Sequence, residues 1–204
     1  MPLVFDIGAN VGSWTIANHD GNSTYVCVEP SPNTYNTLLE NTKHLANTYA
    51  LNVAVSDTAN DCVTFYEHDA ISTLNLDWLA DPSSRFCGTP HNIITVKTIT
   101  LKSLFDTYGT PDLIKVDVES AEYEVIKTLD TPVSTLCFEW AAETREVAFK
   151  CIDHLQSLGM NRFHIHHNDD YKYRPQMYEL SADDAKRILS TTKDKVEWGM
   201  VWAS

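Results

Sequence analysis

Short apolar runs alternate along the chain with stretches in which apolar residues recur every three or four positions. The first runs are Leu3 to Ile7 and Thr24 to Val28, and such short, continuously apolar segments are typical of buried β-strands. A helical pattern follows each of them, from Val11 to about Asn18 and from Pro32 to about Ala46. Ser31 is a favourable N-cap for the second helix, because serine accepts a backbone N–H and proline suits the first helical position. The chain therefore begins with two strand-helix units.

The same alternation continues to the end of the chain. The further expected elements are a strand Ala50–Val55, a strand Leu113–Val118, a helix Ala121–Leu129, a strand Leu136–Glu139, a helix ending at Gly159, strands Phe163–His166 and Val196–Trp202, and between these two a helix that opens at Ser181. Strands separated by helices predict a parallel sheet with helices on both faces, and the two late strands predict a mixed edge. We therefore expect one α/β domain over residues 1–204, a length that suits a single core.

Two further segments, between the third and fourth expected strands, show apolar-polar alternation. Val63 and Phe65 alternate with polar residues, and so do Ile94 and Val96, which predicts an inserted antiparallel pair. The segment from Glu67 to Asn92 that joins them is long and irregular, and irregular segments of more than about 12 to 15 residues are usually functional or mobile. We expect it to form a lid on the ligand side of the sheet and to be mobile without ligand.

Composition and charge narrow the class of protein. Apolar residues make up 43% and charged residues 21% of the chain, as in ordinary globular proteins. The formal net charge of −13 repels phosphate backbones and anionic lipids, so nucleic-acid partners are disfavoured. Because no run approaches the roughly 20 apolar residues of a membrane span and the N-terminus lacks a secretion signal, we expect a cytoplasmic protein without a membrane partner. The five cysteines contain no C-x-x-C pair, which argues against a disulfide framework or a structural zinc site.

A glycine-containing turn joins the first strand to the first helix. Gly8 and Gly12 allow a tight turn and a close approach of the backbone to a ligand, and the helix N-terminus beyond them favours negative charge. Their spacing differs from the G-x-G-x-x-G of dinucleotide-binding folds, and the lysine and Ser/Thr of a P-loop are missing. Glu29 ends the second strand, where an acidic residue can accept hydrogen bonds from the hydroxyls of an adenosine ribose. Together these features predict a ligand at the carboxyl ends of the strands.

Four segments of the chain carry a more specific resemblance. They are Val4-Phe5-Asp6-Ile7-Gly8-Ala9-Asn10-Val11-Gly12, Val28-Glu29-Pro30, Asn52-Val53-Ala54-Val55-Ser56-Asp57 and Leu113-Ile114-Lys115-Val116-Asp117-Val118-Glu119-Ser120-Ala121-Glu122. In order and spacing they resemble the FkbM-type methyltransferases, which are class I enzymes that use S-adenosylmethionine. The resemblance implies a Rossmann-like sheet and S-adenosylmethionine as the cofactor. It also implies that the methionine moiety lies beside Asp6, Gly8, Ala9, Asn10 and Gly12, the ribose on Glu29, and the adenine beside Ser56 and Asp57.

Carboxylates crowd the end of the fourth expected strand. Asp117, Glu119 and Glu122 follow one another closely there, and such crowding should raise at least one pKa. We assign Glu122 to the start of the helix, with Ser120 as its N-cap, and we assign Asp117 and Glu119 to function. Glu139 ends the neighbouring strand, so its side chain could face the same crevice. The predicted catalytic residues are therefore Asp117, Glu119 and Glu139.

These carboxylates could serve in more than one way. They could hold a hard divalent cation such as Mg²⁺ or Ca²⁺, or they could orient a hydroxyl or act as a general base. We favour the role without a metal. His164 and His166 fall on one face of a late strand, a spacing that could chelate a transition metal. For these histidines a solvated edge strand is the favoured interpretation.

The sequence therefore predicts an S-adenosylmethionine-dependent methyltransferase that acts on a hydroxyl of a small molecule or sugar. A second hypothesis is a regulatory or partner protein that binds the cofactor without turnover, which Ser120 favours because the family normally has glycine at this position. A third hypothesis is methylation of an RNA ribose, which the charge of −13 opposes. A second copy of the chain, in place of the segment 67–92, could cover the crevice, so a homodimer stays open.

Overall fold

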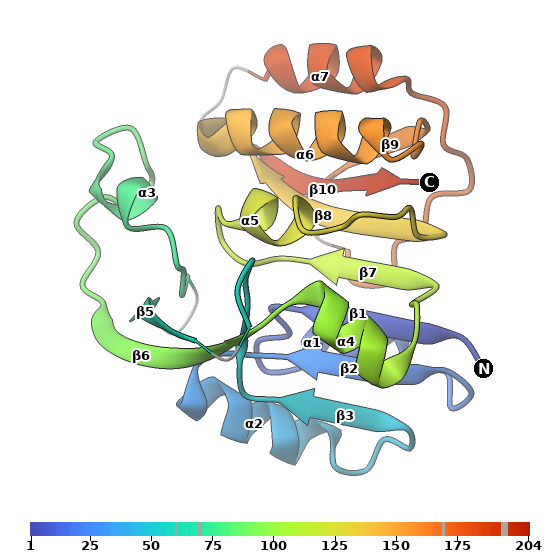
Figure 1. The fold of residues 1–204 in the computed structure, drawn as a ribbon. Helices are drawn as coiled ribbons and strands as arrows, with labels where there is room; N and C mark the ends of the chain where they lie inside the picture. Colours follow the sequence, from blue (N-terminus) through green and yellow to red (C-terminus); the bar gives the residue numbers. More distant parts are fainter. Residues whose placement is uncertain (60, 69–70, 169, 193–195) are drawn as a thin grey trace.

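A seven-stranded sheet forms the centre of the molecule (Figure 1), a computed structural model that describes residues 1–59, 61–68, 71–168, 170–192 and 196–204. Its strands, in spatial order, are β3 (Thr48–Leu51), β2 (Thr24–Val28), β1 (Leu3–Ile7), β7 (Leu113–Val116), β8 (Thr135–Ala141), β10 (Trp198–Ala203) and β9 (Phe163–His167). Neighbouring strands are parallel from β3 to β8, whereas β10 is antiparallel to both β8 and β9. The prediction of a mostly parallel sheet with a mixed edge is confirmed.

Helices cover both faces of this sheet. They are α1 (Ser13–Asn18), α2 (Pro32–Thr42), α4 (Leu101–Tyr108), α5 (Glu122–Ile126), α6 (Arg145–Ser157) and α7 (Ala182–Ser190). Strand β1 shows how the two layers arise: Val4 is buried with Trp14 of α1 and Leu38 of α2, whereas Phe5 is buried with Leu104 of α4. Successive strand residues point to opposite faces, so a continuously apolar strand needs cover on both sides. None of the helices in the described part of the chain combines the length and apolar character that crossing a membrane requires.

A smaller sheet stands beside the main one. It consists of β4 (Ala54–Val55), β6 (Asn92–Ile99) and β5 (Cys62–Glu67) in that order, with β4 parallel and β5 antiparallel to β6. The predicted antiparallel pair is thus confirmed, but the strand predicted over 50–55 is divided between the two sheets. The division falls at Asn52, whose side-chain amide donates to the carbonyls of Glu29 and Pro30 at 2.9 Å each.

The segment between β5 and β6, residues 68–91, projects to one side of the main sheet in Figure 1, and we call it the arm. It contains a short helix, α3 (Leu76–Ala80), which the sequence pattern does not predict. Ile71, Trp78 and Leu79 form a small buried cluster within the arm, separate from the main core. Residues 69 and 70 lie outside the described part of the predicted lid.

Of the three serines predicted to be N-caps, two are confirmed and one is wrong. Ser31 and Ser181 each accept the backbone N–H of the residue three positions on, at 3.3 Å and 3.1 Å. Ser120 does not cap α5, because its φ of 72° is left-handed and Ala121 occupies the N-cap position. The helix α4 was not predicted, although Thr100 caps it in the same way as the two serines.

The order of the strands opens a crevice at their carboxyl ends. After β1 the chain turns to the face that carries α1, and after β7 it turns to the opposite face, which carries α5. Because β1 and β7 are neighbours in the sheet, their loops separate and leave room for a ligand between them.

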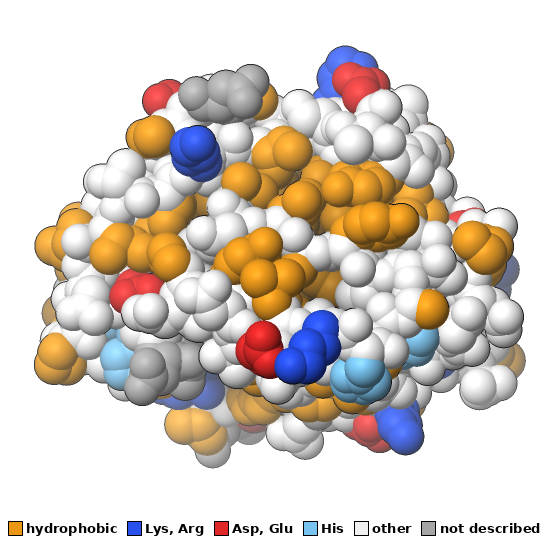
Figure 2. All heavy atoms as spheres, turned by 90° about the horizontal axis from the view of Figure 1, so that it is seen from below, with side chains coloured by type: hydrophobic (Ala, Val, Ile, Leu, Met, Phe, Trp, Pro, Cys, Tyr) orange, Lys and Arg blue, Asp and Glu red, His pale blue; other side chains and the backbone are white. Residues whose placement is uncertain are grey.

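The surface on the side of β3 and α2 is shown in Figure 2. Hydrophobic side chains gather across the middle of this face, with acidic and basic side chains scattered around them. On the edge strand β3, Tyr49 is 50% exposed. This face does not test whether two copies of the chain associate, so the homodimer considered from the sequence stays a prediction.

Candidate active site

The turn after β1 brings the backbones of two neighbouring strands into contact. Gly8 has a φ of 79°, and a Cβ at this position would lie 1.8 Å from the carbonyl oxygen of Asp117, so only glycine fits. Gly12 has a φ of 86°, forms the N-cap of α1 and packs against Leu38 of α2. Ala9 is buried in the same cluster as Leu38. Gly12 and Ala9 therefore pack the turn against α2.

Glu29 follows β2, and its buried carboxylate borders the crevice. Its Oε2 accepts the N–H of Asn10 at 3.0 Å, and its Oε1 accepts the N–H of Ser31 at 2.9 Å. Burial raises the pKa of Glu29 to about 7, although the two N–H groups oppose the shift. A carboxylate has about four acceptor positions, so the two oxygens keep acceptor capacity for a ligand.

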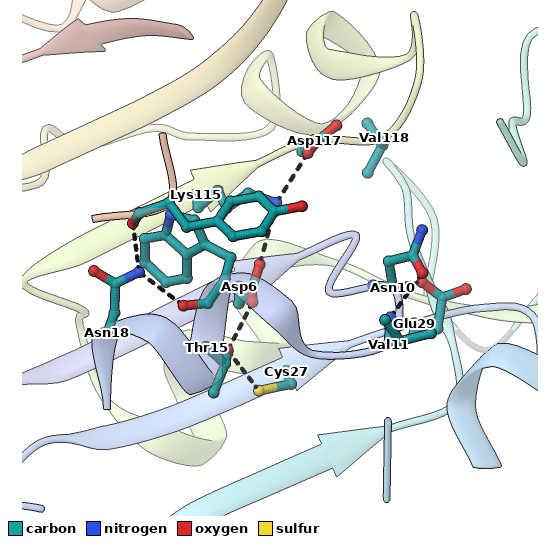
Figure 3. A network of polar contacts seen from close by, with 12 residues as sticks. Asp6, Asn10, Val11, Thr15, Asn18, Cys27, Glu29, Lys115, Asp117 and Val118 are labelled. Carbon is teal, nitrogen blue, oxygen red and sulfur yellow. Dashed lines mark hydrogen bonds and ion pairs between the residues drawn. The ribbon is translucent and has the colours of Figure 1, made fainter. Parts of the chain in front are cut away.

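A buried ionic network lies beneath the turn (Figure 3). Lys115 Nζ, on β7, lies 3.4 Å from Asp6 Oδ1 on β1 and 3.0 Å from Asp117 Oδ2. The other oxygen of Asp6 accepts a hydrogen bond from the Thr15 hydroxyl at 2.7 Å, and Cys27 Sγ lies 3.2 Å from that hydroxyl. Asp6 is fully buried, so Lys115 compensates a charge that would otherwise be costly. Lys115 and Thr15 are not among the predicted site residues, although a lysine inside an apolar strand signals a buried acidic partner.

A cleft of about 820 Å³, its open mouth included, runs along the carboxyl ends of the strands. The predicted site residues that line it are Gly8, Asn10, Glu29, Ser56, Asp117 and Glu119. Asp57 lies next to this lining: its side chain is 53% exposed and its Oδ2 is 3.3 Å from Lys127 Nζ.

Three carboxylates meet at the ends of β7 and β8. One oxygen each of Asp117, Glu119 and Glu139 lie within 4.8 Å of one another. Burial, followed by repulsion from Asp117, raises the pKa values of Glu119 and Glu139 well above the ordinary value. Oxygens at this spacing can share a proton, bind a hydroxyl or surround a divalent cation. The structure brings the three predicted catalytic residues together, and their role stays a prediction.

The turn that carries Glu119 has an unusual backbone. Glu119 and Ser120 have φ values of 53° and 72°, which explains why glycine suits the position of Ser120. Glu122, in the first turn of α5, points back into this turn: its Oε1 accepts the N–H of Val118 at 3.0 Å. Burial raises the pKa of Glu122 to about 7. Glu122 therefore stabilises the turn through its hydrogen bond with the Val118 N–H.

The histidines of β9 do not line the cleft. His164 Nε2 lies 2.6 Å from the hydroxyl of Tyr173, and the ring of His166 stacks on the Tyr173 ring with centroids 3.7 Å apart. The strand β9 is an edge of the main sheet, as expected. Within the described ranges, the acidic cluster of Asp117, Glu119 and Glu139 is the only group of three or more side chains that could hold a metal ion.

The strand order, the glycine turn after β1 and the acidic residue after β2 define a class I methyltransferase, a class that takes its methyl group from S-adenosylmethionine. More narrowly, residues 6–174 match the methyltransferase FkbM domain, and the chain belongs to this family.

Solved structures of similar fold are distant in sequence. The precorrin-6y C5,15-methyltransferase of Geobacter metallireducens is 11% identical, with a TM-score of 0.52 over 100% of this chain and 79% of that one. The fibrillarin of Aeropyrum pernix with natively bound S-adenosyl-L-methionine is 12% identical, with a TM-score of 0.51 over 100% and 66%. The precorrin 8W decarboxylase of Methanobacterium thermoautotrophicum is 10% identical, with a TM-score of 0.51 over 100% and 81%. These similarities concern the fold alone, and no curated protein matches the sequence.

The cleft fits S-adenosylmethionine on its own geometry. Glu29 holds a buried carboxylate at the cleft with acceptor positions left over, as a pair of ribose hydroxyls requires. When bound, this cofactor supplies a methyl group on a positively charged sulfur. The neighbouring carboxylate of Asp117, which also lines the cleft, provides the complementary negative charge.

Proposed function

We propose that this methyltransferase acts on a hydroxyl group of a small molecule or sugar. The observation that carries the proposal is the convergence of Asp117, Glu119 and Glu139, with oxygens within 4.8 Å of one another. Asp117 and Glu119 also line the cleft. An acceptor hydroxyl must be oriented toward the methyl group and must lose its proton, and a set of adjacent carboxylates can do both.

The cofactor-binding residues predicted from the sequence fall into two groups in this proposal, those that contact the cofactor and those that support the turn. Glu29 accepts hydrogen bonds from the ribose hydroxyls, and Ser56 with the adjacent Asp57 borders the adenine. Gly8 and Asn10 lie beside the methionine moiety. The remaining residues support the turn through their packing and ion pairing: Ala9 and Gly12 pack near Leu38, and Asp6 pairs with Lys115.

The three carboxylates divide the work at the acceptor. Asp117 is held by Lys115 at 3.0 Å and orients the acceptor hydroxyl. As the acceptor oxygen bonds to the methyl carbon and the carbon-sulfur bond breaks, the hydroxyl proton passes to a carboxylate oxygen of Glu119. The raised pKa of Glu119 suits this step, because a higher pKa makes a carboxylate a stronger base. Burial, followed by the charges of Asp117 and Glu122, keeps that pKa high, and Glu139 lies beside the other two carboxylates, with its oxygen within 4.8 Å of theirs.

The charge of the site favours a neutral acceptor over RNA. A phosphate-bearing substrate would bring its charge toward Asp117, Glu119 and Glu139 as well as toward a chain with a net charge of −13. Sugars, polyols and phenols carry hydroxyls without this repulsion.

Two isosteric variants test the proposal once a screen of sugars, polyols and phenols has found an acceptor. In Asp117→Asn and Glu139→Gln, kcat should fall by about 100-fold or more, while the dissociation constant for S-adenosylhomocysteine changes by less than about threefold. Glu146→Gln, on the exposed side of α6, is the matched control.

Each other outcome has a definite meaning. Full activity in both variants removes the two carboxylates from the mechanism. Cofactor binding without transfer to any acceptor favours the non-catalytic partner protein, and turnover of RNA favours the ribose methyltransferase. Activity that survives exhaustive chelation with EDTA excludes a divalent cation, and this is the result we expect.

A further inference from the structure

The turn that presents Glu119 is strained. Glu119 and Ser120 adopt left-handed φ values of 53° and 72° in succession. A residue with a side chain is disfavoured in this conformation, because its Cβ approaches the following carbonyl oxygen too closely. Two in a row persist only where the surrounding structure holds them.

The contacts that hold this turn come from the arm. The Thr73 hydroxyl donates to the carbonyl of Glu119 at 2.6 Å. The side-chain amide of Asn75 donates to the Ser120 carbonyl at 3.1 Å and to the Ser120 hydroxyl at 2.9 Å. Thr73 is itself fully buried, and its backbone exchanges two hydrogen bonds with Tyr66 of β5, at 3.0 Å and 3.1 Å. The donors are therefore anchored to a sheet.

The same arm also contacts the chain after β8, the strand that carries Glu139. Trp78 Nε1 donates to Glu143 Oε1 at 3.2 Å, and the backbone N–H of Arg85 donates to Glu143 Oε2 at 2.8 Å. The side chain of Glu143 is only 1% exposed. The arm thus bridges the ends of the two strands whose carboxylates form the acidic cluster.

We infer that Thr73 and Asn75 are positioning residues, which hold the Glu119–Ser120 turn in its left-handed form and so place the Glu119 carboxylate beside Asp117 and Glu139. Neither residue contacts the reacting atoms. The catalytic consequence rests on the function proposed above, whereas the placement of Glu119 does not. On this inference the arm helps to complete the acceptor site.

The variants that test the inference remove the two donors, and Thr73→Val also removes the acceptor of the Asn75 N–H, at 2.9 Å. Thr73→Val keeps the shape of the side chain but loses the hydroxyl. Asn75→Ser keeps an N-cap acceptor for α3 but is too short to reach Ser120. The controls are Thr95→Val and Asn92→Ser, which change exposed residues of β6.

The readout is the titration of Glu119, followed by carboxyl ¹³C chemical shifts and assigned with Glu119→Gln. Asp117 and Glu122 raise the pKa of Glu119, whereas Arg85 and Lys115 lower it, and burial is the largest cause. When the turn relaxes toward solvent, the pKa of Glu119 should fall toward that of an ordinary glutamate in Thr73→Val combined with Asn75→Ser. It should stay unchanged in the controls. The titration is run with and without S-adenosylhomocysteine and needs no acceptor.

A rescue distinguishes positioning from a general loss of stability. The double variant should also lose tenfold or more in kcat. Glycine adopts φ values near 70° without strain, so adding Ser120→Gly should restore part of the raised pKa of Glu119 and part of kcat. An unchanged titration in the double variant overturns the inference whatever the activity does. A shifted titration with undiminished kcat leaves the positioning inference intact and removes Glu119 from the proposed mechanism. Each single variant is measured as well, so that unfolding of the double variant does not decide the result.

Discussion

If Glu29 binds the ribose as proposed, its protonation state should control the affinity of the cleft for the cofactor. Burial raises its pKa to about 7 in the free protein, and only the ionised carboxylate accepts hydrogen bonds on both oxygens. Below pH 7 a bound ribose must first displace a proton, so affinity should rise between pH 6 and pH 8. Calorimetric titration with S-adenosylhomocysteine measures this directly.

The matching variants isolate this carboxylate. Glu29→Gln should abolish the pH dependence and weaken binding by about tenfold or more, because a charge-assisted hydrogen bond contributes roughly 1.5 to 3 kcal/mol. Glu40→Gln, on the exposed side of α2, should change neither quantity. An affinity of the unmodified protein that stays flat across this pH range would contradict the assignment of Glu29 to the ribose.

Gly8 gives a second test at the scale of a single residue. Gly8→Ala introduces a Cβ that would meet the Asp117 carbonyl at 1.8 Å, in addition to the cost of a φ of 79°. Gly21 is the matched control, since its φ is 75° and nothing lies within 4 Å of an added Cβ. Urea unfolding should show a loss of about 1 kcal/mol in Gly21→Ala and a clearly larger loss in Gly8→Ala. Equal losses would mean that contact between the two strands does not require glycine.

At the scale of elements, the arm is the segment whose stability depends most on its environment. Its apolar cluster of Ile71, Trp78 and Leu79 is small and separate from the main core, and its docking relies on polar contacts. Segments with few buried apolar contacts open at low free-energy cost. We therefore expect the amides of residues 71–91 to gain protection from hydrogen exchange when cofactor and acceptor are added to monomeric protein. Strong protection in the free monomer would identify the arm as a permanently packed insertion.

The elements that could be predicted from the sequence are those whose signals are local. The apolar strands, and the helix starts at Ser31 and Ser181, follow from periodicity and capping, which neighbouring residues decide. The division of the third strand at Asn52 could not be predicted, because it depends on hydrogen bonds to the end of β2. The error at Ser120 has the same origin. A serine just before a helix with acidic residues in its first turn is typical of an N-cap, and only the hydrogen bonds from the arm show that Ser120 belongs to the preceding turn.

The candidate site shows the same limit. Glu29, Asp117 and Glu139 could be located because parallel strands present their carboxyl ends at one edge of the sheet. The pairing of Lys115 with Asp6 requires knowledge of which strands are neighbours. The contribution of Thr73 and Asn75 comes from an irregular segment, which carries no periodic signal.

At the scale of the whole molecule, the buried carboxylates make stability depend on pH in an unusual direction. Burial raises the pKa of Glu29 and of Glu122 to about 7, and it raises the pKa of Glu119 and of Glu139 as well. Between the ordinary value of about 4.3 and these raised values, the folded protein binds more protons than the unfolded chain. The free energy of unfolding should therefore decrease as the pH rises from 5 to 8.

Chemical denaturation at several pH values measures this slope. Each raised carboxyl contributes up to about 1.4 kcal/mol per pH unit while it titrates between the two states. Glu122→Gln should make the slope shallower, because glutamine can still accept the Val118 N–H but does not titrate. Glu146→Gln should leave the slope as it is. A free energy of unfolding that increases from pH 5 to pH 8 would show that burial does not raise the pKa values of these carboxyls.

The register of the small sheet has a consequence for how such a protein can diversify. Glu67 and Asn92 face each other as the last pair of the β5–β6 ladder, so the chain leaves the body and returns to it at adjacent points. The ladder already brings the ends of the intervening segment together, and each doubling of such a segment costs only about 0.6 kcal/mol in closure entropy. Gly8 and Glu29, beside the cofactor cleft, belong to the turns after β1 and β2. A lineage can therefore lengthen or shorten the part of this segment that follows Thr73 and Asn75, the residues that hold the Glu119–Ser120 turn, and so acquire new acceptors while it retains the same methyl donor.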